Sequence, residues 1–139
     1  MSPLFKNEKE KLETAANKLL SYAINSGADT AEVCGGYGTK TKITLEKQDY
    51  HLASSDDGYS LGVRVLKGNR QGFASCNSTD ATELKEIAIK ANEIAGFSPD
   101  NPHYNIQRAN NIPIEAPHNL VDPALTEISL QTQKEWTQL

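Results

Sequence analysis

The chain has few of the residues that mark nucleic-acid binding, membrane insertion or a disulfide scaffold. Its 139 residues include two cysteines, and its 14 Lys and Arg are outnumbered by 18 Asp and Glu, giving a formal net charge of −4. No basic run is present, which argues against a nucleic-acid surface. No stretch approaches the ~20 apolar residues of a membrane span, and the N-terminus lacks the apolar core of a signal peptide. We therefore expect a cytoplasmic protein that binds neither nucleic acid nor membrane.

Cysteine and histidine, the usual soft metal ligands, are scarce and scattered. Cys34 and Cys76 both fall in segments with strand periodicity, so we expect reduced, buried thiols rather than a disulfide. His51, His103 and His118 have no short spacing between them and form no helical His-Glu-x-x-His pattern. The sequence therefore predicts no metal site and no metal cofactor in this chain.

Candidates for catalysis are equally weak. Asp56 and Asp57 are adjacent carboxylates before Gly58, a combination that favours capping of a turn over shared-proton chemistry. No Gly-x-Ser-x-Gly nucleophile elbow occurs. The glycines of residues 35–41 resemble a phosphate loop only superficially, because a strand follows where a helix is needed, and they favour a bulge or a tight connection. The chain alone is thus not expected to be an enzyme. Catalytic activity through the Asp56-Asp57 turn is a weaker hypothesis than the two non-catalytic functions given below.

Two helices are predicted at either end of a run of strands. Residues 8–26 place apolar side chains at helical spacing, and Gly27 is positioned to end that helix. Asp80 is a suitable N-cap with Glu83 three residues later, and we expect this second helix to end at Gly96. Between the helices, alternating patterns predict strands over residues 31–37, 41–47, 50–54, 58–67 and 70–76.

The last two of these strands form a hairpin whose register can be counted. Gly68 and Asn69 tolerate the positive φ of a two-residue turn, which closes Lys67 on Arg70. Counting back predicts the pairs Leu66–Gln71, Val65–Gly72, Arg64–Phe73, Val63–Ala74, Gly62–Ser75 and Leu61–Cys76. One face is small and apolar. The other is mixed and carries Arg64 and Phe73. We expect Tyr59, Arg64 and Phe73 to be the residues that could face a partner or substrate, with an Arg64–Phe73 stack as the purely structural alternative.

The predicted fold class is α+β. Short connections favour an antiparallel sheet of about five short strands flanked by two helices, in the order α-β-β-β-β-β-α, followed by an extended Pro- and Asn-rich tract. The predicted divisions are an N-terminal domain at residues 1–97, a linker at 98–121 and a further helical segment at 122–139. Helix starts are expected at Asp122-Pro123 and Ser129. The last segment ends within a helical pattern, so we expect a truncated chain whose C-terminal domain is absent.

The order and spacing of several segments resemble the N-terminal domain of the TldD/PmbA family. The resemblance lies in residues 27–33, 62–65 and 68–75, the helix of residues 80–95, the Ser98-Pro-Asp100 tract, and Asp122-Pro123 followed by Ser129. The Ser-Pro-Asp tract and residues 120–123 are more similar to the PmbA (TldE) branch than to the TldD branch.

The resemblance implies a function in proteolysis. Family members are bacterial and archaeal cytoplasmic proteins, also called modulators of DNA gyrase, that assemble as TldD–TldE zinc metallopeptidases. Their zinc site is a His-Glu-x-x-x-His helix in the C-terminal domain of the TldD subunit, and nothing here matches it, so no catalytic or metal residue is carried over. The resemblance implies a non-catalytic domain that supports a hetero- or homodimer and guides unfolded peptides, in a system for proteolysis, peptide-antibiotic maturation and antitoxin degradation. The alternative is an interaction module that regulates a partner such as DNA gyrase without any peptidase role.

Overall fold

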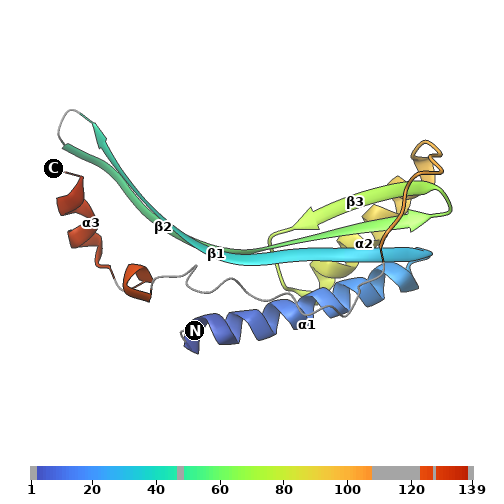
Figure 1. Ribbon diagram of the computed structural model, residues 1–139, viewed down its shortest axis with the longest axis horizontal. Helices are drawn as coiled ribbons and strands as arrows, with labels where there is room; N and C mark the ends of the chain where they lie inside the picture. The colour runs from blue at the N-terminus through green and yellow to red at the C-terminus, as the bar shows by residue number, and fades with distance from the viewer. Residues whose placement is uncertain (1–2, 47–48, 108–122, 127, 138–139) are drawn as a thin grey trace.

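The structure, a computed structural model, describes residues 3–46, 49–107, 123–126 and 128–137. The element order is α1 (Pro3–Asn25), β1 (Thr30–Glu46), β2 (Asp49–Lys67), β3 (Arg70–Cys76), α2 (Ala81–Phe97), the 3-10 helix η1 (Pro123–Thr126) and α3 (Leu130–Trp136), as Figure 1 shows. The predicted α+β class with an antiparallel sheet is confirmed.

The number of strands is a correction to the sequence-based prediction. The described residues form a three-stranded sheet in the order β1-β2-β3, with both neighbouring pairs antiparallel, in place of five short strands. β1 joins two of the predicted strands across the glycines of residues 35–38, and β2 runs straight through Asp56, Asp57 and Gly58, where a turn was predicted. The register of β1 and β2 shifts only between Thr44 and Leu45, so the expected bulge is not at the glycines.

The hairpin of β2 and β3 has the predicted register at every pair from Lys67–Arg70 to Leu61–Cys76. Gly68 has the positive φ, 57°, that the turn requires. The alternation places Leu61, Val63 and Val65 on one face, each less than 2 % exposed. The residues of the turn and the two-residue alternation of apolar side chains therefore determine the register of this hairpin.

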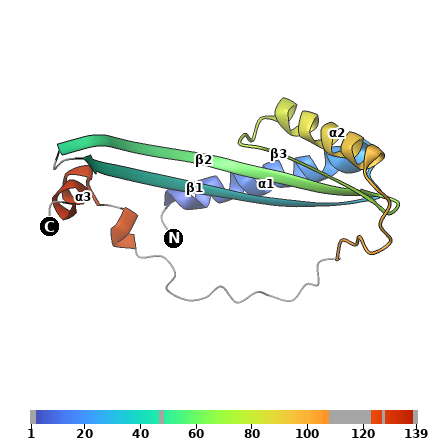
Figure 2. The same cartoon turned by 90° about the horizontal axis from the view of Figure 1, so that it is seen from above.

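Both long helices cover that apolar face, as Figure 2 shows from above. A single cluster of buried side chains joins α1, the sheet and α2: Ala15, Leu19, Ala23, Ala28, Leu61, Val63, Val65, Ala74, Leu84, Ile87, Ala88, Ala91 and Ala95. The many alanines bring helix and strand backbones close together. Among the described glycines, Gly72 is the most tightly packed: an added Cβ would stand 1.9 Å from the carbonyl oxygen of Ala91.

One polar side chain lies inside this core. Asn92 of α2 is 4 % exposed, and its Nδ2 donates to the carbonyl oxygens of Ala23 and Ala88, each at 3.0 Å. The Ala23 carbonyl, near the C-terminal end of α1, also accepts from the Ala28 N–H at 3.2 Å, so the Asn92 side chain adds a second bond to it. Asn92 thus joins the two helices through a backbone group.

The helix ends follow mostly from local residues. Gly27 has φ 104° just after α1, and the Asp80 side chain accepts from the backbone N–H groups of Thr82 and Glu83 at the start of α2. α2 continues to Phe97, one residue past Gly96, where its end was predicted. α3 begins after the N-cap Ser129 as expected, and it is a third α-helix beyond the two flanking the predicted strands.

Other predictions for the chain's ends are corrected or lie outside the described residues. Pro123 opens a short 3-10 helix rather than an α-helix. Asp122 and most of the predicted linker lie outside the described residues, and the division at 97 and 121 stays a prediction. The part of the linker that is described lies by the hairpin turn, where the Asn101 N–H donates to the Asn69 carbonyl at 2.9 Å.

The prediction of two buried thiols was wrong. Cys34 is exposed and Cys76 is half-buried, although both are free thiols. Cys34 has the opposite strand parity to Val33, so its side chain lies on the face that the helices leave open. Among the helices of the described residues, none has the length and apolar character needed to cross a bilayer.

β1 and β2 extend well beyond the helix-covered body, as both views show (Figures 1 and 2). We call this two-stranded extension, residues 37–46 and 49–59, the arm. α3 lies by its outer end, where Ile43 of the arm lines a shared hollow with Leu125, Ile128 and Trp136. Isolated two-stranded ribbons are marginal in water, so the arm depends on contacts at its base and tip.

Candidate functional site

The sheet changes from three strands to two at the base of the arm. β3 pairs with β2 only from Leu61 to Lys67. On the side of β2 where β3 lies, no described residue pairs with Asp49–Ser60, although β1 pairs with this stretch on its other side. We call this side of Asp49–Ser60 the open edge. It presents backbone N–H and C=O groups of the kind that an added strand pairs with.

A hollow lies where the open edge begins. Its walls are residues 36–40 of β1 and 56–60 of β2, and Asn77 closes the end next to β3; its volume is about 660 Å³. Gly38 and Gly58 stand directly opposite each other in the middle of these walls. No heavy atom lies within 4 Å of a Cβ built at either glycine, so the backbone is bare there. Glycine in a strand interior often marks a place where another backbone approaches closely.

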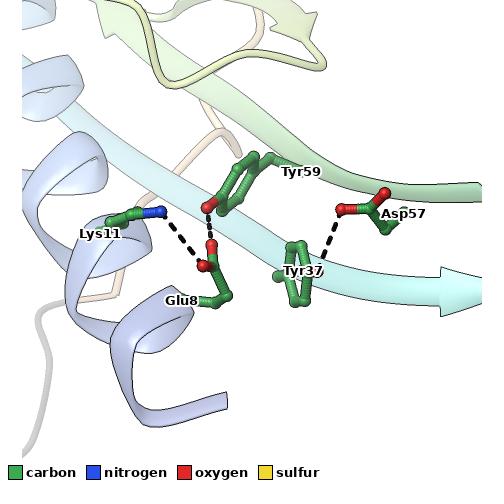
Figure 3. A network of polar contacts seen from close by, with 5 residues as sticks. All are labelled: Glu8, Lys11, Tyr37, Asp57 and Tyr59. Carbon is green, nitrogen blue, oxygen red and sulfur yellow. Dashed lines mark hydrogen bonds and ion pairs between the residues drawn. The ribbon is translucent and has the colours of Figure 1, made fainter. Parts of the chain in front are cut away.

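On the helix-covered side, the base of the arm is tied to α1 by a polar network, drawn in Figure 3. The Tyr59 hydroxyl donates to the Glu8 carboxylate, and Lys11 Nζ lies 3.1 Å from the same carboxylate. Glu8 is only 9 % exposed, so these two donors compensate a carboxylate that has lost most of its water. α1 therefore fixes the direction in which the arm leaves the body.

The neighbouring strand contributes a second tyrosine. The rings of Tyr37 and Tyr59 are 5.1 Å apart with an interplanar angle of 49°, and the Tyr37 hydroxyl donates to Asp57 at 3.2 Å. Partial burial, then the hydrogen bond to Asp57 and the negative charges of Asp57 and Glu8, raises the pKa of the Tyr37 phenol. Tyr37 thus stays protonated at neutral pH and acts as a donor, not as a base.

Arg64 and Phe73 lie on the opposite face of the sheet from Tyr59. They are directly opposed in register, as predicted, but each has its own neighbour. The Arg64 guanidinium donates to Glu32 at 2.5 Å and to Gln71 at 3.1 Å. The Phe73 ring covers Gly62, where an added Cβ would stand 2.9 Å from the ring, and the side chain is 54 % exposed.

The structure therefore separates the three residues singled out from the sequence. Tyr59 belongs to the network at the base of the arm, whereas Arg64 and Phe73 belong to the open sheet face. Glu8 and Tyr37 were not predicted as site residues, and Asp57 was predicted to lie in a turn. Alternation along β1 and β2 would have paired Tyr37 with Tyr59 if the two strands had been recognised as continuous. Glu8 is 51 residues from Tyr59 and has no local signal.

The described residues of the site do not have the arrangement that a metal site needs. Among the described residues, no group of three or more His, Cys, Asp or Glu side chains is arranged to hold a metal ion. His118 lies outside the described residues, and the His103 backbone N–H donates to the Asn101 side chain in a turn after α2. What the site offers is an unpaired strand edge, a bare stretch of backbone and exposed acidic side chains.

Comparisons with known proteins give one family and one fold. Residues 31–95, from β1 into α2, match the family model described as PmbA/TldA metallopeptidase domain 1. The structure is similar to the crystal structure of TldE from Thermococcus kodakarensis, with a TM-score of 0.64 and 20% sequence identity. That match covers 74% of this chain and 23% of the TldE chain, so this chain spans less than a quarter of the structure it resembles. No curated protein matches the sequence.

Proposed function

Given that residues 31–95 belong to the first domain of the PmbA/TldA metallopeptidase family, we propose that this chain is the non-catalytic N-terminal domain of a TldD/PmbA-type peptidase system. In this proposal it guides unfolded peptides and supports assembly with a TldD- or TldE-type partner subunit. The likeness of its fold to TldE supports placing it in such a complex.

The observation that carries the proposal is the open edge of β2, Asp49–Ser60. An unfolded peptide has its own backbone groups free, and it can add to such an edge as a further strand. Main-chain hydrogen bonds supply the affinity and need little side-chain identity, which suits a guide for varied peptides. β1, at the opposite edge of the sheet, is the corresponding surface for contact with a partner subunit.

Peptide cleavage is assigned elsewhere in the system. Among the described residues, no three His, Cys, Asp or Glu side chains are arranged to hold a metal ion, so these residues do not fit a catalytic zinc site. In the proposal, zinc belongs to the C-terminal domain of a TldD-type subunit. The present chain contributes only the holding and orienting of the extended substrate.

The test leaves the protein unaltered and changes the backbone of the peptide. A fluorescein-labelled unstructured peptide is made in three forms: unmodified, N-methylated at odd positions and N-methylated at even positions. In an added strand, successive N–H groups point to opposite sides, so only one set pairs with β2. We expect one methylated form to lose most of its affinity in fluorescence anisotropy and the other to keep it. Equal affinity of all three forms would show that binding does not use the strand edge.

A further inference from the structure

We propose that the open edge of β2 beside the hollow takes an extended peptide segment carrying Lys or Arg, which lies in line with β3 as a continuation of the third strand. The inference rests on the proposed function for the binding of peptides, and it adds the place and the side-chain class. Two observations support it: the space beside the open edge and beyond the end of β3, which we call the vacancy, and the distribution of charge over the arm.

The vacancy is continuous with an existing strand position. β3 ends at Cys76 opposite Leu61, so the next residue of β2, Ser60, is the first on the open edge. The chain then leaves the sheet, because Ser78 Oγ accepts from the Asp80 N–H and Asp80 caps α2. An extended segment placed beyond the end of β3 could therefore pair with β2, and Asn77 would be the residue beside the end of the segment next to β3.

In the half of the arm nearer the body, the two strands carry charges of opposite sign. β1 carries the exposed Lys40 and Lys42, whereas β2 carries the exposed Asp56 and Asp57. Only β2 adjoins the vacancy, so an entering strand has the acidic strand as its neighbour. Opposite charges on adjacent strands favour pairing, and like charges oppose it.

The same distribution argues against a second copy of this chain as the occupant. Two β2 edges paired antiparallel about a two-fold axis through this stretch would bring Asp56 and Asp57 of one copy near those of the other. The Tyr37 hydroxyl donates to Asp57 without neutralising its charge. Lys40, opposite Asp56 on β1, is the cation placed closest in register, and it lies on the far side of β2 from the vacancy. Excess negative charge thus faces the open side.

The hollow also has room for a long side chain. Above Gly38 and Gly58 no side chain stands, and the space is bordered by Asp56 on β2, nearest the open edge, and by Lys40 on β1. A Lys or Arg stem entering from the adjacent strand can lie across the bare backbone with its charged end at the Asp56 carboxylate. Such side chains commonly lay an apolar stem along a surface while keeping the charge solvated.

The experiment compares three peptides of one sequence that differ at two central positions, which carry Lys, norleucine or Glu. Affinities for the unaltered chain are measured by anisotropy at low salt and at 0.5 M NaCl. We expect the Lys peptide to bind at least tenfold more tightly than the Glu peptide at low salt, with norleucine between them. High salt should reduce the difference.

Two protein variants locate the effect. Asp56→Asn with Asp57→Asn should abolish the preference for Lys, whereas Glu93→Gln with Glu83→Gln on α2 removes the same charge and should retain it. Circular dichroism and thermal melting confirm that each variant is folded. Equal binding of the three peptides to the unaltered chain would overturn the inference, as would retention of the Lys preference in the folded Asn variant. If the inference fails in this way while alternate N-methylation still selects one form, the proposed function stands without it.

Discussion

Gly38 and Gly58 face each other across β1 and β2, one residue beyond the Tyr37–Tyr59 pair. This glycine pair marks the boundary between the part of the sheet that packs against helices and the part that consists of two strands alone. On the body side, the strands are packed against helices and tied to α1 through Glu8. On the arm side, two strands continue alone toward α3. The direction of the arm therefore depends on the last side-chain contacts before the glycines.

The bond between Tyr59 and Glu8 should hold the arm in place. Tyr59→Phe removes a donor to a carboxylate that is only 9 % exposed, and we expect a loss of about 1.5–3 kcal/mol in the free energy of unfolding. Tyr37→Phe is the matched control, because its acceptor Asp57 is exposed and can bind water instead. Urea unfolding measures both. Equal effects of the two substitutions would contradict the assigned role of Glu8.

Close packing of β3 against α2 should make Gly72 intolerant of even a methyl group. In Gly72→Ala the new Cβ would lie 1.9 Å from the Ala91 oxygen and 2.7 Å from the Ala95 nitrogen, both backbone atoms. We expect a loss of about 3 kcal/mol or more as α2 is displaced. Gly96→Ala is the control: it lies in α2 with open space around it and should stabilise by about 0.5–1 kcal/mol. Thermal melting that ranks the two variants in the opposite order would refute this packing.

The hairpin and the helix caps could be predicted because their causes are local. Gly68-Asn69 sets the turn, and the register of Val63 and Ala74 follows by counting. Asp80 and Gly27 act on the backbone within a few residues of themselves. Each of these predictions needed only neighbouring positions in the chain.

The arm could not be predicted, because its cause is pairing between distant residues. Asp56, Asp57 and Gly58 are strong turn formers, yet each pairs with a residue of β1, and the ladder outweighs the local preference. The turn predicted at these three residues divides β2 into two short strands, and the open edge could therefore not be predicted. The candidate site was likewise predicted only in part. Tyr59 was identified, but its hydrogen-bond partner Glu8 lies in α1, and no sequence spacing connects the two residues.

The stability of the chain should fall at acid pH partly through Asp80. Hydrogen bonds from the N–H groups of Thr82 and Glu83 lower the pKa of the Asp80 carboxyl below that of the unfolded chain. A lowered folded-state pKa means stability that is present above the unfolded value, about 4, and is lost as pH falls through the folded value. Asp80→Asn keeps a capping side chain without the charge, so its melting temperature should fall less between pH ~5 and ~2. An unchanged pH profile would remove Asp80 from the acid response.

The glycine pair should control both the stiffness of the arm and its capacity to bind peptides. Positive φ is found only at Gly27 and Gly68 among the described glycines, and neither Gly38 nor Gly58 has a neighbour that a side chain would strike. Gly38→Thr with Gly58→Thr should therefore fold normally and stabilise the arm by up to about 1 kcal/mol, because β-branched residues favour strands. We expect slower hydrogen exchange at the arm amides.

The same variant should bind extended peptides less well, because the threonine side chains occupy the bare backbone beside the open edge. Lys42→Thr separates the two effects: it introduces the same β-branched residue on the same face of the arm, four pairs beyond the glycines, where a side chain already stands. It should slow exchange with little change in peptide affinity. If the glycine variant slows exchange and yet binds peptide as tightly as the unaltered chain, the peptide does not pass over Gly38 and Gly58, and the binding edge must lie farther along β2.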